Sequence, residues 1–297
     1  MRLVERKDID EILWDSWCEN SSKFSPFSRL AYLDAVADNL LFVVNADQTG
    51  GLALPYLERM GVKTLYTPVF CRWIMWLGEN RPSVSELTAF VNIHFKQAEV
   101  YTQDQIFEGE KETLIYQIVK KEDFALNSQV KRKLKKAENE NWQISWNASI
   151  EKSLSVIESS LKNKFTTLED TSFPKLRKLA LNLKDSGLLR VISLLNKEGE
   201  SIGSLLLIVD KKHCLYLKGA CEESVKMAGG MYYLMNEALR FAFENDLSFD
   251  FGGSRISGVR KFNLSFGASD QNYYSNSWNR GPFWYSVLKS IRQRVKK

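Results

Sequence analysis

The C-terminal half of the chain contains short apolar runs of strand length, separated by polar stretches that are typical of turns. After the third run, apolar residues recur at i, i+3, i+4, i+7 and i+8 from Met231, a spacing that predicts an amphipathic helix. The predicted elements are helices over 154–165 and 174–184, strands over 189–195, 202–209 and 214–219, a helix over 231–245, and a strand over 247–251 that ends at Gly252 and Gly253.

The N-terminal half shows a similar order of elements with weaker signals. It predicts a helix over 28–37, strands over 40–46 and 51–59, a helix over 84–95, and strands over 98–101 and 114–119. Helices that alternate with hairpin strands predict an α/β architecture with a mixed sheet. We expect two pseudo-equivalent halves, an N-terminal domain over 1–148 and a C-terminal domain over 149–297.

The composition is that of a globular protein. Of the 297 residues, 44% are hydrophobic and 26% are charged, which leaves little room for long disorder. No run approaches the roughly 20 apolar residues of a spanning helix, and the N-terminus lacks the apolar core of a signal peptide. We therefore expect a cytoplasmic protein without a transmembrane segment, whose four cysteines are reduced.

Several chemistries lack the residues they need. The only histidines are His94 and His213, so a histidine-based hydrolase or a structural zinc site is not expected, and we predict no bound metal. The glycine motifs that hold ATP phosphates or dinucleotides are absent, and so is the nucleophile motif of α/β-hydrolases.

The first candidate site precedes the helix predicted from Met231. Lys226, Gly229, Gly230 and Met231 lie where a helix N-terminus offers unpaired N–H groups and partial positive charge, which favour a phosphate. The glycines would let the backbone approach such a ligand closely. In the alternative interpretation, the two glycines serve only the turn that starts the helix.

The second candidate site follows the strand over 247–251. Asp250 alternates with two phenylalanines and should face away from their core, and the cations Arg255, Arg260 and Lys261 follow it. Ligands commonly bind at the carboxyl ends of strands in open α/β sheets. The alternative is a structural salt bridge beside a glycine turn.

These segments resemble a known family. Three segments, Phe249–Ser254, Val259–Phe262 and Phe266–Ala268, are similar to a signature of the acyl-CoA N-acyltransferase (GNAT) superfamily, in the branch of FemABX-like aminoacyltransferases and BioF2-like acetyltransferases. Leu54–Arg59 and Tyr66–Phe70 resemble the first half of that branch. The resemblance implies a tandem GNAT-like fold and transfer of an acetyl or aminoacyl group to an amine.

The resemblance also implies roles for single residues. Asp250 is the candidate general base, and Tyr216 or Tyr232 is the candidate acid that protonates the leaving group. The donor would lie at Lys226, Gly229, Gly230 and Met231, and the substrate would be bound by Arg255, Arg260, Lys261 and Lys218. The usual pyrophosphate loop reads Gln or Arg, two variable residues, Gly, one variable residue, then Gly or Ala, so Lys226 and Met231 depart from it. Acyl-CoA is the expected donor, with aminoacyl-tRNA as the alternative.

The third candidate is a basic segment. Residues 131–136 hold five cations, and like charges four residues apart repel each other on a helix capped by Asn127 or Ser128. Such a face suits an anion such as tRNA, while the alternative is a solvated face balanced by Glu138 and Glu140. The formal charge of +5 equals the five cations of residues 289–297, so it describes a C-terminal tail.

The leading hypothesis is an N-acyltransferase whose C-terminal half binds the donor. Its acceptor would be a small-molecule amine or the amine of a peptidoglycan precursor, and tRNA would be a partner through 131–136. The alternatives are a non-catalytic binding protein with a degenerate GNAT fold, and a nucleic-acid-binding module.

Overall fold

The chain is described from a computed structural model, which covers residues 1–21, 26–146, 148–162, 169–253 and 256–281. It divides into two compact units, and the division does not coincide with the boundary expected at residue 148. Unit 1 comprises 1–33, 37–114 and 273–297, and unit 2 comprises 34–36 and 115–272. The strands β7 (Glu110–Val119) and β13 (Ser269–Asn279) both cross this division, so the chain leaves and re-enters unit 1 within strands.

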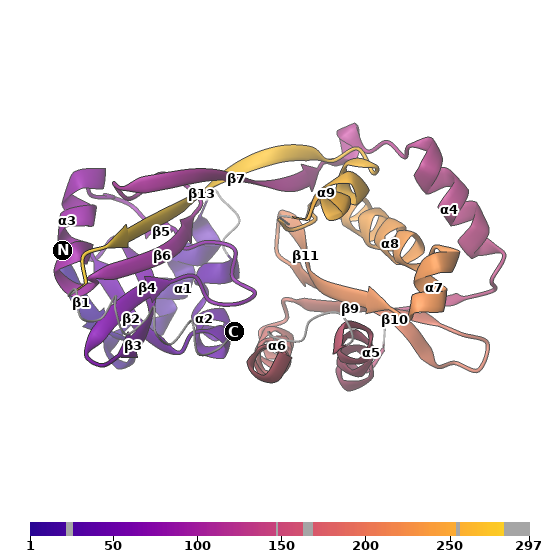
Figure 1. Cartoon of the computed structure of the whole chain (residues 1–297), viewed down its shortest axis with the longest axis horizontal. Helices are drawn as coiled ribbons and strands as arrows, with labels where there is room; N and C mark the ends of the chain where they lie inside the picture. Colours follow the sequence, from indigo (N-terminus) through magenta and orange to yellow (C-terminus); the bar gives the residue numbers. More distant parts are fainter. Residues whose placement is uncertain (22–25, 147, 163–168, 254–255, 282–297) are drawn as a thin grey trace. The chain divides into compact units, whose positions relative to one another are not determined.

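Unit 1 contains a mixed sheet with the strand order β1-β2-β3-β4-β6-β13, and β5 pairs with β3 (Figure 1). Neighbouring strands are antiparallel except for β4 and β6, which are parallel and joined through helix α3. The elements are β1 Arg2–Glu5, α1 Glu11–Asn20, α2 Leu30–Val36, β2 Asn39–Val44, β3 Gly50–Arg59, β4 Val62–Tyr66, β5 Trp76–Gly78, α3 Val84–His94 and β6 Gln97–Thr102.

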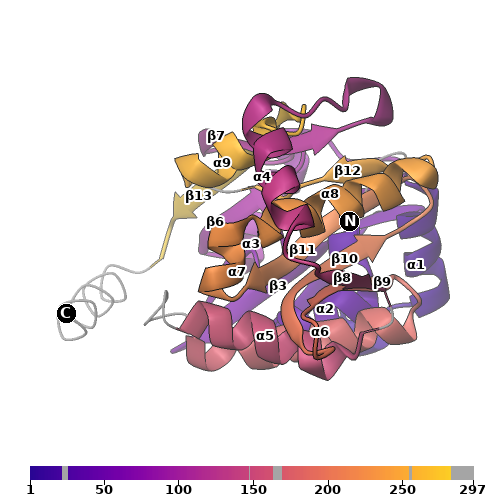
Figure 2. The same ribbon diagram turned by 90° about the vertical axis from the view of Figure 1, so that its right-hand side faces the viewer.

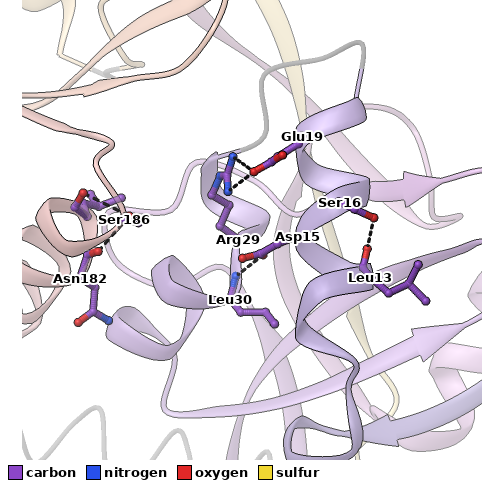
Figure 3. Close-up of polar contacts among 9 residues, drawn as sticks. Leu13, Asp15, Ser16, Glu19, Arg29, Leu30, Asn182 and Ser186 are labelled. Atoms are coloured by element: carbon purple, nitrogen blue, oxygen red, sulfur yellow. Dashed lines mark hydrogen bonds and ion pairs between the residues drawn. The ribbon is translucent and has the colours of Figure 1, made fainter.

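Polar contacts tie the first two helices of unit 1 together, as Figure 3 shows. The carboxylate of Asp15 on α1 accepts the backbone N–H of Leu30 at 3.3 Å, which satisfies a donor in the first turn of α2. Arg29, the residue before α2, forms an ion pair with Glu19 at 3.4 Å. Burial raises the pKa of Asp15.

Unit 2 contains a sheet with the order β7-β12-β11-β10-β9-β8, in which only β11 and β12 are parallel. Helices α5 and α6 cover one face, and α4, α7 and α8 lie on the other (Figures 1 and 2). The elements are α4 Ser128–Glu138, β8 Gln143–Ser145, α5 Ile150–Lys162, α6 Glu169–Asp185, β9 Leu189–Leu195, β10 Ser201–Val209, β11 His213–Cys221, α7 Glu223–Ala228, α8 Gly230–Glu244, β12 Ser248–Asp250 and α9 Ser257–Leu264.

The main core of unit 2 lies between its sheet and α8. Leu234, Met235 and Leu239 of the predicted helix face are buried against strand residues that include Leu205 and Phe249. This confirms the predicted face, because the apolar spacing places these side chains on one side of α8. The alternation of helices and hairpin strands also confirms the predicted mixed α/β class.

Candidate functional site

The parallel strands β11 and β12 separate at their carboxyl ends. Their pairing ends where Leu215 lies beside Asp250, but β11 continues to Cys221 along β10. The register of β11 against β10 shifts at the same place, because Lys218 pairs with Leu206 while Tyr216 pairs with Leu207. A β-bulge of this kind re-aims side chains, and ligands of open α/β sheets bind at such strand ends.

Lys218 follows this bulge. Its partner Leu206 is buried but lies outside the cluster under α8, whereas the neighbouring Leu205 and Leu207 belong to that cluster. Lys218 therefore shares the face of Leu206, away from α8. Burial lowers the pKa of Lys218, and its ammonium forms no ion pair with a residue in the described part of the chain.

Asp250 ends β12 and is 3% exposed. It alternates with Phe249 and Phe251, which belong to the cluster under α8, so its carboxylate lies on the opposite face, as the alternation predicts. The Oδ1 atom accepts the N–H of Gly252 at 2.8 Å, and Gly252 has a φ of +76°. The carboxylate therefore stabilises the turn that ends the strand.

The two candidate tyrosines lie on the α8 side of the sheet, opposite Asp250. The hydroxyl of Tyr216 donates to the carbonyl of Gly219 at 3.2 Å, and burial raises its pKa. Tyr232 on α8 accepts a hydrogen bond from Gln129 Nε2 at 3.2 Å, and its ring lies 4.8 Å from that of Phe262. The sheet therefore separates Asp250 from the predicted acids.

The two glycines before α8 are buried, and close packing requires them. Gly229 has a φ of +104°, and a Cβ there would lie 2.7 Å from the carbonyl oxygen of Lys133 on α4. A Cβ on Gly230 would lie 2.4 Å from Val225 Cγ1. Because packing alone explains both glycines, their presence is not evidence for a phosphate cradle. Residues 223–228, for which the sequence predicted no helix or strand, form helix α7.

The other two residues of this candidate site are partnered differently. Lys226 lies half exposed on α7 and forms an ion pair with Glu223 at 3.6 Å. The Sδ atom of Met231 lies 4.0 Å from the Cys221 thiol, and Met231 packs against the core. Helix α8 has no side-chain cap and no acid in its first turn, so its dipole is not offset by a carboxylate of that turn.

Helix α4 packs beside α7 and α8 (Figure 2), and its lysines and arginine at 131, 132, 135 and 136 are exposed. Asn127 caps it, accepting the N–H of Val130 at 2.9 Å, while Lys133 Nζ donates to the carbonyl of Met227 at 3.4 Å. Among the described residues, no ion pair offsets the four exposed cations of this face, Lys131, Arg132, Lys135 and Lys136. The expected balance by Glu138 and Glu140 does not involve direct ion pairs.

A hydrogen-bonded chain fixes α9. Arg260 forms an ion pair with Asp270, whose Oδ1 also accepts Gln117 Nε2 at 2.9 Å. The buried Gln117 Oε1 accepts Asn263 Nδ2 at 2.9 Å. Arg260 holds the pKa of Asp270 below its usual value, so Arg260 has a structural partner. Lys261 is exposed, and Arg255 lies outside the described residues.

Gln117 and Asp270 position the segment that carries Lys261, but neither was among the candidate residues predicted from the sequence. Gln117 is a polar residue between Ile115 and Val119 in an apolar run, and a polar residue that interrupts a buried strand signals a hydrogen-bond network. Its partners lie 146 and 153 residues away, so only the fold could identify them. No group of His, Cys, Asp or Glu in the described part of the chain is arranged to hold a metal ion.

Part of this geometry lies in a segment that matches a family model. Residues 126–268 match the model of the acetyltransferase (GNAT) domain, and this segment contains β11, α8, β12 and α9. No curated protein matches the chain in sequence. Within the described residues, no helix is both long and apolar enough to cross a membrane.

Solved structures with the same fold cover nearly the whole chain. The crystal structure of FemX is similar with a TM-score of 0.65 and 9% identity, covering 100% of both chains. The C-terminal domain of a putative lysylphosphatidylglycerol synthetase from Agrobacterium fabrum has a TM-score of 0.63 and 10% identity, covering 96% of each chain. A tandem GNAT protein from the clavulanic acid biosynthesis pathway has a TM-score of 0.54 and 10% identity, covering 95% of this chain and 99% of that one. The chain therefore has the tandem GNAT fold.

Proposed function

We propose that this chain, whose residues 126–268 match the model of the GNAT acetyltransferase domain, is an N-acyltransferase with its donor site in unit 2. The observation that carries the proposal is the separation of β11 from β12 beyond Leu215 and Asp250, with a bulge at Leu217, inside the matched segment. A strand end with backbone groups that have no partner in the next strand suits an acyl carbonyl, whose oxygen becomes negative during transfer.

The reaction is direct transfer. The lone pair of a neutral acceptor amine attacks the acyl carbonyl carbon, the bond to the donor sulfur or oxygen breaks, and a proton passes from the amine nitrogen to the leaving group. This route requires no covalent nucleophile. The β11 backbone would polarise the carbonyl oxygen, and Lys218, half-buried beyond the bulge, would bind an anionic group of the substrate.

An acyl-CoA is the donor we favour. The uncapped first turn of α8 and the adjacent Lys226 would meet its phosphates. Because Gly229 and Gly230 are buried by packing, contact would come from N–H groups and side chains beyond them, with Met231 and Tyr232 partly exposed there. Lys261 on α9, like Lys218, is a cation of the predicted substrate set that forms no ion pair with another described residue.

Aminoacyl-tRNA is the second donor candidate, because of the exposed basic face of α4. Its four outward cations flank α7 and the start of α8, so a polyanion bound there would lie beside the proposed donor site. The names of two structural neighbours, FemX and a lysylphosphatidylglycerol synthetase, accord with this donor and with an acceptor in a cell-envelope precursor. We propose such an amine acceptor, either a small molecule or a peptidoglycan precursor.

An assay of acyl transfer from each candidate donor tests the proposed N-acyltransferase activity. The full chain is incubated with acetyl-CoA or with aminoacyl-tRNA and a panel of small amines, and release of free thiol or deacylated tRNA is followed together with the acylated amine. The proposal predicts an acylated amine in stoichiometric balance with the released carrier. Saturable donor binding without any product would favour the non-catalytic alternative, and absence of both binding and product would contradict an acyltransferase.

The basic face is tested separately. Replacing Lys131, Arg132 and Lys135 by Gln should weaken tRNA binding and flatten its dependence on salt, because each neutralised phosphate contact releases counterions. Glu138→Gln on the same helix is the matched control and should not weaken binding. If tRNA affinity is insensitive to salt and to the triple substitution, α4 is not the tRNA surface.

A further inference from the structure

A cavity of about 370 Å³ opens on one face of the unit-1 sheet, formed entirely by β3, β4, β6 and Thr67. Along β6, Ala98 and Val100 belong to the buried core, so the intervening Glu99 and Tyr101 point to the other face. The cavity is therefore built on the sheet face opposite the core, and none of its residues belongs to the segment matched by the GNAT model.

The neutral polar groups of this cavity already hydrogen-bond within unit 1. Gln97 accepts the Thr64 hydroxyl at 3.4 Å, and its Nε2 donates to Asn279 at 2.9 Å. The Thr67 hydroxyl oxygen accepts the Tyr101 N–H at 2.7 Å. Tyr66 donates its hydroxyl proton to the carboxylate of Asp38 at 2.5 Å. These contacts fix the walls, and they leave recognition mainly to the charged groups.

The two charged residues of the cavity are Arg59 and Glu99. Both are exposed, and neither forms an ion pair with another residue in the part of the chain that the structure describes. Arg59 pairs with Val62 and Glu99 with Tyr66, so they lie four residues apart along β4 and two strands apart across the sheet. These offsets are about 13 Å and about 10 Å, which places the two Cα atoms about 16 Å apart.

We propose that this cavity binds a small elongated zwitterion, with its anionic group on Arg59, its ammonium on Glu99 and its apolar middle against Leu57, Tyr66 and Tyr101. The separation of the two charged residues excludes an α-amino acid as a bridging ligand, because its charges are only one carbon apart. An ω-amino acid with several methylenes spans the gap left by the two side chains. The proposal does not depend on acyl transfer.

The test measures binding of linear zwitterions of increasing length to the full chain by calorimetry and by NMR. Glycine, 4-aminobutyrate, 6-aminohexanoate and 8-aminooctanoate serve as probes. The proposal predicts that affinity rises with length up to the match, and that Arg59→Gln and Glu99→Gln each weaken the best probe by at least about fivefold. The matched controls are Arg81→Gln and Glu58→Gln, exposed residues outside the cavity, which should leave affinity unchanged.

Each remaining outcome contradicts the proposal. Equal affinity for glycine and the longer probes would show that the two charges are not bridged. Binding that survives Arg59→Gln or Glu99→Gln, with thermal unfolding unchanged, would place the ligand elsewhere. Absence of saturable binding for every probe would show that the two residues are ordinary solvated charges. Because the readout is binding in unit 1, these results are independent of the acyl-transfer assay.

Discussion

Units 1 and 2 each contain a strand, a helix and a second strand parallel to the first, but the two helices begin differently. In unit 1, α3 lies between the parallel strands β4 and β6, after the short strand β5, and starts with a capping box, in which the Ser83 hydroxyl accepts the Glu86 N–H and the Glu86 carboxylate accepts the Ser83 N–H. In unit 2, α8 lies between the parallel strands β11 and β12, after helix α7, and its N-cap is Gly229, with no side-chain cap and no acid in its first turn. A carboxylate therefore offsets the helix dipole at the start of α3, whereas the first turn of α8 contains no carboxylate that could do so.

The difference bears on where an anionic donor can bind. At the start of α3, the Glu86 carboxylate accepts the Ser83 N–H and offsets the helix dipole, and the Ser83 hydroxyl accepts the Glu86 N–H. The start of α8 has no such carboxylate and lies beside the cations of α4 and Lys226. This contrast supports a donor site at α8, as proposed for unit 2, rather than at α3.

Loss of Lys218 should produce the largest effect. We expect Lys218→Met to lower kcat/KM for acyl transfer by about 10- to 100-fold, because a charge-assisted contact to substrate contributes roughly 1.5–3 kcal/mol. Lys211→Met, in the exposed turn before β11, is the matched control. Steady-state kinetics with both variants checks this, and equal rates for the two would remove Lys218 from the site.

Substitution of Gly229 should affect stability next most strongly. We expect Gly229→Ala to lower the free energy of unfolding by about 2 kcal/mol or more, because it combines a left-handed φ with a Cβ 2.7 Å from the Lys133 carbonyl oxygen. Gly61→Ala has a left-handed φ with no atom within 4 Å and should cost about 1 kcal/mol. The free energy of unfolding of each variant is measured in urea, with hydrogen exchange reporting on each unit separately. Equal losses of stability in the two variants would mean that the α4 backbone does not restrict the space around Gly229.

Removal of the unit-1 cap should have a smaller effect. We expect Ser83→Ala to destabilise α3 by about 1 kcal/mol at neutral pH. Hydrogen bonds from Ser83 hold the pKa of Glu86 below its ordinary value of 4.5, so their contribution is present above that value and is lost as the pH falls through the folded pKa. The difference between wild type and variant, measured by urea unfolding from pH 7 to pH 3, should shrink with acid. A difference that stays constant would exclude the capping carboxylate as its cause.

The smallest expected effect concerns the basic face of α4. Replacing Lys135 by Gln should stabilise unit 2 by about 0.2–0.5 kcal/mol, because it relieves repulsion from Lys131 one turn earlier. The same variant should bind tRNA less tightly if aminoacyl-tRNA is the donor. A loss of stability would indicate that Lys135 has a structural role.

Local patterns predicted much of the fold. Strands β9 and β10, helix α8 and helix α3 lie within one or two residues of their predicted bounds, because each is specified by apolar periodicity and local caps. The patterns missed β4, which is short and shows no regular alternation, and predicted no element over residues 223–228. Both depend on tertiary pairing, with β6 and with α8 respectively.

The candidate site was less predictable than the fold. The alternation of residues 249–251 indicated which face Asp250 occupies, and the cation at Lys218 was visible in the sequence. The sequence could not show that Gly229 meets Lys133, which lies 96 residues earlier, or that Arg260 pairs with Asp270. Such contacts depend on how distant helices and strands pack. They give Gly229 and Arg260 structural roles in place of the ligand contacts predicted from the sequence.

Hydrogen exchange with and without the acyl donor tests the central claim most directly. The full chain is labelled in the presence of saturating acetyl-CoA and, separately, aminoacyl-tRNA, and protection is mapped along the sequence. The account predicts slower exchange in residues 216–221 of β11 and in the first turn of α8, with little change in β4, α3 and β6. Protection in β4–α3–β6 instead, or no protection with either donor, would contradict it.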